Sequence, residues 1–498
     1  MLTYTLDEKN DRAGGGFSAG STFAAIRTKT LYEQLYEKIR DDILSGTLAA
    51  STRLPSKREL ARNEAVSVIT VENAYAKLVD EGYVTALPKK GFFVADISVD
   101  ERLKKPAFAR VHEQTSLAGR AAATDSGAAS DCISLCGTGF NEALFPFATW
   151  SRLARRVLSE QRTDCMQSSP ANGIHALREA IARHLYGFRG LSVRPEQIVV
   201  GAGTEYLYSL ILQLLGFENV FAIEDPGYAK IARIYEACSV RAVPVPVEEQ
   251  GISIDALKAS GANIAHISPS HHFPTGRTTT ISRRYELLSW ASAGDSRYII
   301  EDDYDAEFRL TGRVIPTLAS IDTIDRVIYL NTFTKTLSPA LRISYMVLPL
   351  SLLEQFKQRL GFYASTVPTM HQLTLALFMQ DGHFESHINS LRRYYRDRRD
   401  AAVAALRRFP ALADAEVLEA DAGVYFLLRV PTEKSDAELK AACAREGVEI
   451  SCLSDFYVGQ GAVARNKETA HTLLVYYASL GEDKLEEAFT RLSRAVEE

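Results

Sequence analysis

The residues best suited to chemistry in this chain of 498 residues include a lysine set among hydroxyl groups. Lys335 lies in the segment TFTKTL, directly after the short apolar run 327–330, and Asp302 and Tyr304 follow another apolar run, 298–300. A lysine amine can condense with an aldehyde, a carboxylate can keep a pyridine nitrogen protonated, and a phenol can donate to a ring oxygen. Pyridoxal phosphate (PLP) requires these three groups, with Lys335 as the lysine of the Schiff base.

Two further loops contain the other groups that PLP requires. The segment GAGTE, residues 201–205, follows the apolar run 198–200 and opens a helical stretch, so its amides and the Thr204 hydroxyl can hold a phosphate. Tyr228 follows the run 220–223 and can stack on an aromatic ring. Either loop alone is a common turn, but polar loops after parallel strands meet at one edge of the sheet. The spacing therefore predicts a single PLP site at that edge.

The elements that must position these loops alternate along the chain. From residue 133 onward, short apolar runs are separated by helical stretches such as 206–215 and 285–293. Strands that are apolar along their whole length are typical of sheets with helices on both faces. The pattern predicts a mostly parallel α/β sheet.

The N-terminal part of the chain has a different pattern. Apolar residues at helical spacing after Thr30, and the helix-start signals Ser56 and Ser67, predict three helices, followed by strands at 83–86 and 91–94. Three helices and a hairpin are the order of a winged helix-turn-helix, which contacts both base edges and phosphates. The candidate DNA-contacting residues are Ser56, Arg58, Ser67, Thr70, Lys89 and Lys90.

These patterns divide the chain into four parts. We predict a flexible N-terminus at 1–28, a winged helix-turn-helix domain at 29–96, a linker at 97–132 and a PLP-binding domain at 133–498. A surface helix over part of 116–129 is the alternative to a linker that is flexible along its whole length. The predicted fold class is an α+β winged helix-turn-helix domain followed by an α/β PLP-dependent transferase domain.

Composition excludes several other classes of protein. The net charge of −5 means that a local patch, and not the whole chain, must make any DNA contact. The six cysteines form no C-x-x-C pair, so we expect free thiols and no metal site; adjacent His271 and His272 point apart. No signal peptide and no apolar run of membrane-spanning length is evident, so we expect a cytoplasmic, nucleoid-associated protein without membrane contact.

The N-terminal motifs resemble a known family. LPSKRELA, EGYV and GFFV are similar to the winged helix of the GntR superfamily, and Arg58 matches the arginine that touches DNA there. The turn before the recognition helix usually contains an arginine where Val68 stands, and Glu72 stands where some members have another. The resemblance therefore implies DNA binding with fewer guanidinium contacts.

The whole arrangement resembles MocR-type regulators, which fuse a GntR winged helix to a fold-type I, aminotransferase-like domain. Four segments are similar to the sequence motifs of that subfamily: EDPGYAKIARIY, SPSHHFPTG, IIEDDYDAEFR and TFTKTLSPALRISY. The resemblance implies that Lys335 carries PLP, Asp302 meets the pyridine nitrogen, Tyr304 meets the ring oxygen and Tyr228 covers the ring. It also implies which residues surround the phosphate: Gly203, Thr204, Glu205, Thr332 and Arg342.

The chain departs at three places from the sequences that it resembles. Phe273 stands where enzymes of this fold usually have an asparagine before Pro-Thr-Gly, and His272 replaces the glutamine that is usual in the MocR subfamily. The strand at 472–478 lacks the arginine that binds a substrate carboxylate in aminotransferases. The missing arginine argues against ordinary amino-acid transamination and against an α-amino acid as the effector.

Three functions remain open at this point. The favoured one is a PLP-dependent transcriptional regulator that responds to PLP or to an amino compound that reacts with bound PLP. We expect a double-stranded DNA operator with two half-sites and a domain-swapped homodimer, in which each winged helix lies near the partner's PLP domain. The alternatives are a catalytically active aminotransferase with an accessory DNA-binding module, and a PLP reservoir without a DNA role.

Overall fold

The structure is a computed structural model that describes residues 30–87, 90–95, 132–137, 141–311, 315–458, 470–478 and 480–498. The predicted flexible N-terminus (1–28), nearly all of the predicted linker and the wing-tip residue Lys89 lie outside these ranges. Within them, no helix combines the length and the apolar character needed to cross a membrane.

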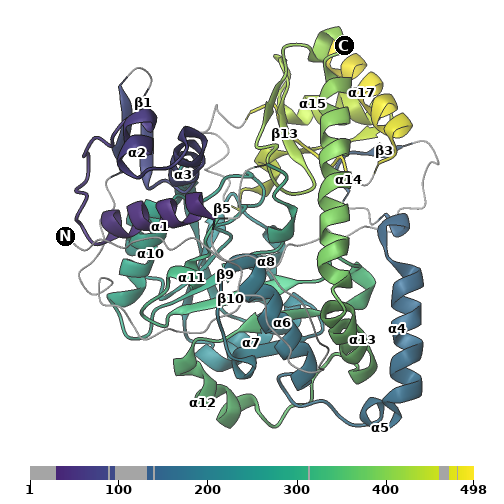
Figure 1. The fold of residues 1–498 in the computed structure, drawn as a ribbon. Coiled ribbons are helices and arrows are strands. Elements are labelled where there is room, and N and C mark those ends of the chain that lie inside the picture. Colours follow the sequence, from purple (N-terminus) through teal and green to yellow (C-terminus); the bar gives the residue numbers. More distant parts are fainter. Residues whose placement is uncertain are drawn as a thin grey trace, which may run out of the picture.

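The N-terminal unit consists of three helices and a hairpin (Figure 1). Ser56 Oγ accepts from Glu59 N at 3.3 Å and Ser67 Oγ accepts from Thr70 N at 3.0 Å, so both serines cap helices as predicted. The first strand starts at Val84 and not at Tyr83, because Tyr83 N donates to the preceding helix. The elements are α1 (Leu31–Leu44), α2 (Lys57–Asn63), α3 (Val68–Asp80), β1 (Val84–Leu87) and β2 (Gly91–Val94).

An eight-stranded sheet forms the centre of the C-terminal domain, in the order β4-β11-β10-β9-β8-β5-β6-β7. Neighbouring residues of one strand belong to different cores: Ile299 packs on one face and Ile300 on the other. Burial of both faces explains the continuous apolar runs. The strands are β4 (Ile198–Gly201), β5 (Val220–Asp225), β6 (Arg241–Glu248), β7 (Gly251–Ile252), β8 (Ile264–Ile267), β9 (Tyr298–Asp302), β10 (Val327–Thr332) and β11 (Ser344–Val347).

Helices cover this sheet on both sides (Figure 1). The helical stretch predicted at 206–215 lies within α7, and the one predicted at 285–293 ends one residue beyond α10. The helices are α4 (Phe147–Glu160), α5 (Arg162–Cys165), α6 (His175–Arg189), α7 (Thr204–Leu215), α8 (Ala229–Ala237), α9 (Ile254–Ala259), α10 (Ile281–Ser292), α11 (Leu318–Ile321), α12 (Leu350–Leu360) and α13 (Thr369–Gln380).

A smaller C-terminal subdomain has its own core around an antiparallel sheet in the order β12-β13-β16-β15. A short parallel pair, β3 with β14, joins residues near 133 to this subdomain. Its elements are β3 (Ile133–Ser134), α14 (His383–Leu406), β12 (Glu416–Leu418), β13 (Phe426–Arg429), α15 (Asp436–Arg445), β14 (Val448–Glu449), β15 (Ser451–Cys452), β16 (Thr472–Val475) and α17 (Glu482–Glu497).

The winged helix packs on α10 of the C-terminal domain, and one continuous apolar core includes residues of both. A Cβ built on Gly82, just after α3, would stand 3.2 Å from Ile281 Cγ2. The hydroxyl groups of Tyr83 and Tyr285 also interact across this contact. The end of α3 is therefore held against the first turn of α10.

Candidate functional site

The predicted site loops meet at one edge of the large sheet. Strand β11 runs antiparallel to both β4 and β10, so β4 and β10 run in the same direction, as do β9, β8 and β5. The carboxyl ends of these strands carry Gly203, Lys335, Asp302, Ser268 and Tyr228. Lys335 is half-buried in the loop after β10. The strand order therefore brings the loops together at one sheet edge, as expected from the sequence.

Asp302 lies at the end of β9 and is 1% exposed. Tyr208 on α7 donates from its hydroxyl to Asp302 Oδ2 at 2.8 Å, and His266 Nε2 lies 3.3 Å from the same oxygen. Tyr235 on α8 holds the other ring nitrogen of His266 at 2.6 Å. Burial, followed by the charge of Asp302, raises the pKa of Tyr208 well above its usual value, so the hydroxyl stays a donor.

These partners of Asp302 were missed at the level of sequence. Tyr208 is separated from Asp302 by 94 positions in the sequence. For His266, the only available signal was a polar side chain within the otherwise apolar run 264–267. The two side chains fix the orientation of the carboxylate from two different elements. A carboxylate held in this way is suited to face a ring nitrogen.

Tyr304 lies two residues beyond Asp302 and is also buried. Its hydroxyl lies 3.2 Å from His271 Nδ1, and the same nitrogen lies 2.7 Å from Asp305 Oδ2. Burial, followed by the charge of Asp305, raises the pKa of Tyr304 well above its usual value. The phenol is therefore protonated and able to donate to a ring oxygen. His271 faces Asp305 and His272 faces Glu224, so the two adjacent imidazoles do not converge on one point.

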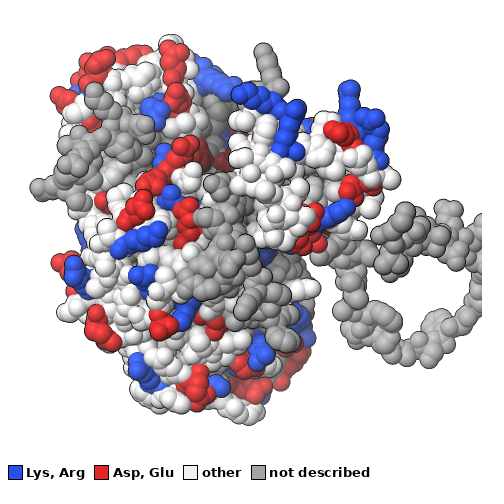
Figure 2. All heavy atoms as spheres, turned by 90° about the vertical axis from the view of Figure 1, so that its left-hand side faces the viewer, with Lys and Arg blue, Asp and Glu red and all other residues white. Residues whose placement is uncertain are grey.

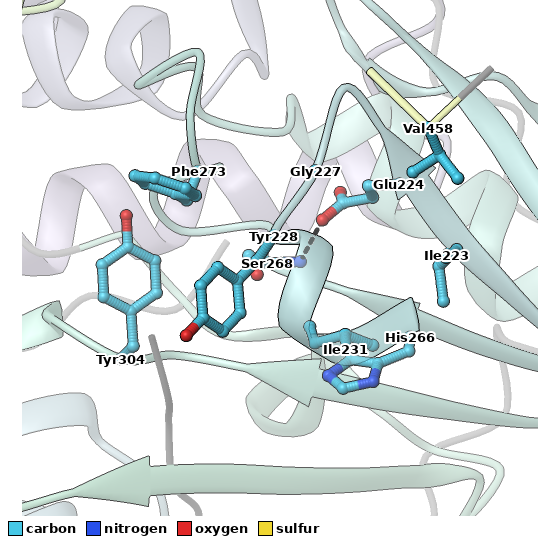
Figure 3. Close-up of a pocket in the computed structure, with 10 residues that line it drawn as sticks. All are labelled: Ile223, Glu224, Gly227, Tyr228, Ile231, His266, Ser268, Phe273, Tyr304 and Val458. Atoms are coloured by element: carbon cyan, nitrogen blue, oxygen red, sulfur yellow. Dashed lines mark hydrogen bonds between the residues drawn. The ribbon is translucent and has the colours of Figure 1, made fainter. Parts of the chain in front are cut away.

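A pocket opens beside these side chains, between β5, β8 and the first turn of α8 (Figure 3). In Figure 3, Tyr228 lies between Tyr304 and the Glu224 side of the pocket, and the Tyr304 hydroxyl points toward the ring of Phe273. Phe273 thus occupies the neighbourhood in which aminotransferases of this fold carry a polar amide. The lining residues are Ile223, Glu224, Gly227, Tyr228, Ile231, His266, Ser268, Phe273, Tyr304 and Val458.

Glu224 is the acidic residue of this lining, and its carboxyl is buried. Its Oε2 accepts from Ser268 N at 2.8 Å and lies 3.6 Å from His272 Nε2. Burial, only partly offset by the Ser268 hydrogen bond, raises the pKa of Glu224 to about 8. Burial also lowers the pKa of His272 to about 3. Near neutral pH both groups are therefore uncharged, and Glu224 presents a neutral carboxyl to the pocket.

The predicted phosphate residues form a cradle at the N-terminus of α7. Gly203 has a left-handed φ of 90° and a Cβ there would stand 2.2 Å from Arg342 Nη2, so only glycine allows the arginine to lie over the helix end. Arg342 Nη2 donates to Ala202 O at 3.4 Å. Thr204 begins the helix, and Thr332 Oγ1 accepts from Ser344 Oγ at 2.8 Å.

One acid and two bases lie together in this cradle. Arg342 and Lys230 both donate to the carboxylate of Glu205, the second residue of α7. Burial would raise the pKa of Glu205, but the hydrogen bonds from Lys230 and Arg342 outweigh it and lower the pKa to about 2. Lys230, the second residue of α8, was not among the residues singled out from the sequence. Its position two residues after Tyr228 was the available signal.

This set of residues fits PLP. A buried carboxylate, a neutral phenol and an arginine over a helix N-terminus match the ring nitrogen, ring oxygen and phosphate, and Lys335 lies at the same sheet edge. The cofactor would supply an aldehyde and an electron-poor ring. The chain's own residues would orient that ring through Asp302 and cover it with Tyr228.

The candidate DNA contacts lie on the winged helix. Arg58 on α2 is exposed, as is Lys90 at the wing, while Ser56 and Ser67 are exposed helix caps. Ser67 Oγ also lies 2.8 Å from Thr70 Oγ1, so both hydroxyls are already partly engaged. Figure 2 shows Lys and Arg gathered at the upper edge of one face, with basic and acidic residues mixed elsewhere. That distribution agrees with a local basic patch.

The first turn of α3 presents apolar side chains to solvent. Val68 is 42% exposed and Ile69 is 69% exposed. The next outward residue, Glu72, forms an ion pair with Lys57 of α2, so the acid is compensated and the lysine is engaged. The face of α3 that recognition helices turn toward DNA is therefore more apolar than basic.

Comparison with known proteins assigns both parts of the chain. Residues 31–94 match the family of bacterial regulatory proteins called gntR, and residues 137–492 match aminotransferase class I and II. Over 85% of its length, the chain is 34% identical to the probable rhizopine catabolism regulatory protein MocR of Rhizobium meliloti, covering 86% of that protein. The chain belongs to the MocR-type transcriptional regulators. This MocR-type chain is a regulator with an aminotransferase fold, as the resemblance implied.

Two further relatives describe the range of the similarity. An HTH-type transcriptional regulator of Bacillus subtilis, YdeL, of uncharacterized function, is 34% identical over 93% of the MocR-type chain and 96% of its own length. The solved structure of LysN, an alpha-aminoadipate aminotransferase from Thermus thermophilus, complexed with N-(5'-phosphopyridoxyl)-L-leucine, has a TM-score of 0.62 at 25% identity. It covers 74% of the MocR-type chain and 92% of LysN.

Proposed function

We propose that this MocR-type regulator binds PLP through Lys335 and that the occupancy of the site changes how a homodimer binds a double-stranded DNA operator with two half-sites. The signal is PLP itself or an amino compound that reacts with the bound cofactor. Asp302 faces the pyridine nitrogen, Tyr304 the ring oxygen and Tyr228 the ring. Gly203, Thr204, Glu205, Thr332 and Arg342 surround the phosphate.

The observation that carries this proposal is the contact between α3 and α10. The pocket loop 268–279 leads directly into α10, and Gly82 at the end of α3 packs on Ile281 in the first turn of α10. Arg284, one turn further, is fully buried and donates to Pro269 O at 2.7 Å and to Thr279 O at 3.1 Å. A shift of the pocket loop would therefore move the surface on which the recognition helix rests.

Arg284 also connects this surface to the ring site. Its Nη1 lies 3.6 Å from Oε1 of Glu301, the residue directly before Asp302. The Glu301 carboxylate also accepts from Leu318 N and Ala319 N, both at 2.8 Å. On the winged-helix side, the buried Glu81 accepts from Tyr36 and lies 3.7 Å from Lys77. The winged helix thus rests on a part of the PLP domain that is hydrogen-bonded to the pocket loop and ion-paired with the end of β9.

The homodimer and the exchange of winged helices between partners belong to this proposal. Within one chain, the winged helix packs on its own α10. The same two surfaces would meet between partners in an exchanged dimer. Such an arrangement would place two recognition helices on two half-sites and would act in the bacterial cytoplasm, at the nucleoid.

We propose that α3 reads thymine methyl groups through Val68 and Ile69. Apolar side chains exposed at the start of a recognition helix match the methyl group that thymine alone presents in the major groove. Ser56, Arg58, Ser67, Thr70, Lys89 and Lys90 would hold the flanking phosphates. The operator is therefore expected to contain A·T pairs where an arginine would select G·C.

An unbiased DNA selection with the full-length protein, with and without PLP, tests this function. The proposal predicts an enriched motif with two half-sites whose recovery depends on PLP. Failure to enrich any motif would leave a PLP reservoir as the better account. In parallel, multiple-turnover transamination with a panel of amines, at about 1 per second or faster, would favour an aminotransferase with an accessory DNA-binding module.

A further inference from the structure

The predicted phosphate cradle already contains a negatively charged side chain, Glu205. Glu205 follows Thr204 at the positively polarised N-terminus of α7, and its two carboxylate oxygens accept from Lys230 of α8 and from Arg342. Both cations that lie near the expected phosphate are therefore already paired. Glu205 also lies close enough to the ring-covering Tyr228 to contribute, after burial, to the raised pKa of that phenol.

The charges of this cluster decide how a phosphate would bind. Two cations and one carboxylate give the cradle a net charge of about +1, while a phosphate monoester carries −1.5 to −2 near neutral pH. The phosphate must therefore approach a fixed negative charge, and it competes with that charge for the Arg342 guanidinium. Side-chain exposures of 50% for Arg342 and 39% for Lys230 leave the ion pairs partly screened by water, so they can exchange partners.

The position of Arg342 means that Glu205 and a phosphate would compete for the same guanidinium. Gly203 leaves the space that the Arg342 guanidinium occupies, since an added Cβ would stand 2.2 Å from Arg342 Nη2. The guanidinium therefore lies over the helix end that the phosphate would use, where it also donates to Ala202 O at 3.4 Å. A phosphate at this helix end would meet the same guanidinium that Glu205 already binds.

We propose that Glu205 is a built-in competitor of the cofactor's phosphate, which closes the cradle in the PLP-free protein and weakens PLP binding so that occupancy follows the cofactor's concentration. This inference rests on the proposed function, since it concerns the same site. A regulator that reads PLP levels requires such reversible occupancy, whereas an enzyme gains from permanent retention of its cofactor. Glu205 accordingly acts on cofactor binding through Arg342 and Lys230, and not by direct contact with the reacting atoms.

The test compares PLP with pyridoxal, which has the aldehyde and the ring but no phosphate. Glu205→Gln keeps the side chain's size and removes its charge, and the equilibrium uptake of each compound is followed by the visible absorbance of the lysine-bound form. We expect the variant to bind PLP at least threefold more tightly and pyridoxal with unchanged affinity. Inorganic phosphate should displace PLP from both proteins and should have the lower inhibition constant with Glu205→Gln.

Two variants control this experiment. Glu236→Gln removes an exposed carboxylate from α8 outside the cradle and should leave both affinities unchanged. Lys230→Gln removes a cradle cation and should weaken PLP binding while sparing pyridoxal. If Glu205 merely orients Arg342, Glu205→Gln will weaken PLP binding, and that result would overturn the inference.

The outcomes separate the two proposals. If the wild-type protein takes up PLP and Glu205→Gln binds it equally well or less well, the competitor role is wrong and the proposed function stands. If the wild-type protein takes up no PLP, the proposed function itself fails. Should Glu205→Gln fold poorly, Glu205→Ala gives the same predicted direction and decides the matter.

Discussion

Gly82, which follows the recognition helix, packs against Ile281, which begins the helix after the pocket loop, and a Cβ on Gly82 would stand only 3.2 Å from Ile281 Cγ2. The φ of Gly82 is 78°, a left-handed value that glycine adopts without strain. Gly82 therefore serves two purposes, since it ends α3 and permits the close approach of the two domains.

Gly82→Ala should weaken the coupling between PLP and DNA. The added methyl group must push α3 away from α10, so the ratio of operator affinities with and without PLP should fall toward one. Gly46→Ala is the matched control, because Gly46 also follows a winged-helix α-helix with φ 80° but has no atom within 4 Å of its Cβ position. Both variants should lose about 1 kcal/mol of stability. Equal coupling in the two variants, measured by fluorescence anisotropy, would contradict this function of the contact.

Lys335→Ala should abolish the visible absorbance of lysine-bound PLP and every effect of PLP on DNA binding. Binding to the operator in the absence of PLP should remain, since Lys335 lies in the loop after β10 and belongs neither to the winged helix nor to the apolar core that supports it. Lys357→Ala, at an exposed position of α12, is the control and should keep both properties. A normal absorbance band from Lys335→Ala would show that another lysine holds the cofactor.

Val68→Arg should change the sequence preference of the regulator. An arginine at this position can bind guanine with two hydrogen bonds, which typically contributes about 1–3 kcal/mol of discrimination. DNA selection should therefore recover G·C in place of A·T at one position of each half-site. Asp414→Arg, which adds an arginine at an exposed site of the C-terminal subdomain, should leave the motif unchanged. A motif that is identical for wild type and Val68→Arg would exclude base contact by residue 68.

Glu224 predicts a pH dependence of stability. Its pKa is raised from 4.5 to about 8 in the folded protein. The protonated carboxyl therefore contributes fully to the stability of the folded protein below pH 4.5, and this contribution is lost as the pH rises through 8. In the wild type, this group should lower the free energy of unfolding by an amount on the order of a few kcal/mol between pH 5 and 8. Glu224→Gln has no such titration, so its melting temperature should depend less on pH. Glu236→Gln should retain the wild-type slope. Parallel slopes for wild type and Glu224→Gln would refute the buried, protonated state.

The sequence predicted those parts of the site that depend on local order. Lys335, Asp302, Tyr228 and Gly203 each follow a strand, and parallel strands bring such loops together without further information. The helix caps Ser56 and Ser67 were predictable for the same reason, because a cap is decided within four residues.

Pairings between distant elements escaped prediction. The hydrogen bond from Tyr208 to Asp302 depends on how α7 packs beside β9, and the Lys230–Glu205 pair depends on the separation of α7 from α8. Periodicity placed Val71, which is buried, in the apolar stripe of the third helix, but it did not single out the exposed Ile69 as a DNA-facing residue. Such facts follow from tertiary packing and not from the order of residue types.

The account can be tested most directly by titrating PLP into the purified protein while recording the visible absorbance and the affinity for the selected operator in the same samples. It predicts that operator affinity changes at least several-fold and that both curves have the same midpoint, since a coupling of about 1–3 kcal/mol is typical of such regulation. A saturating absorbance with unchanged operator affinity would contradict the central claim.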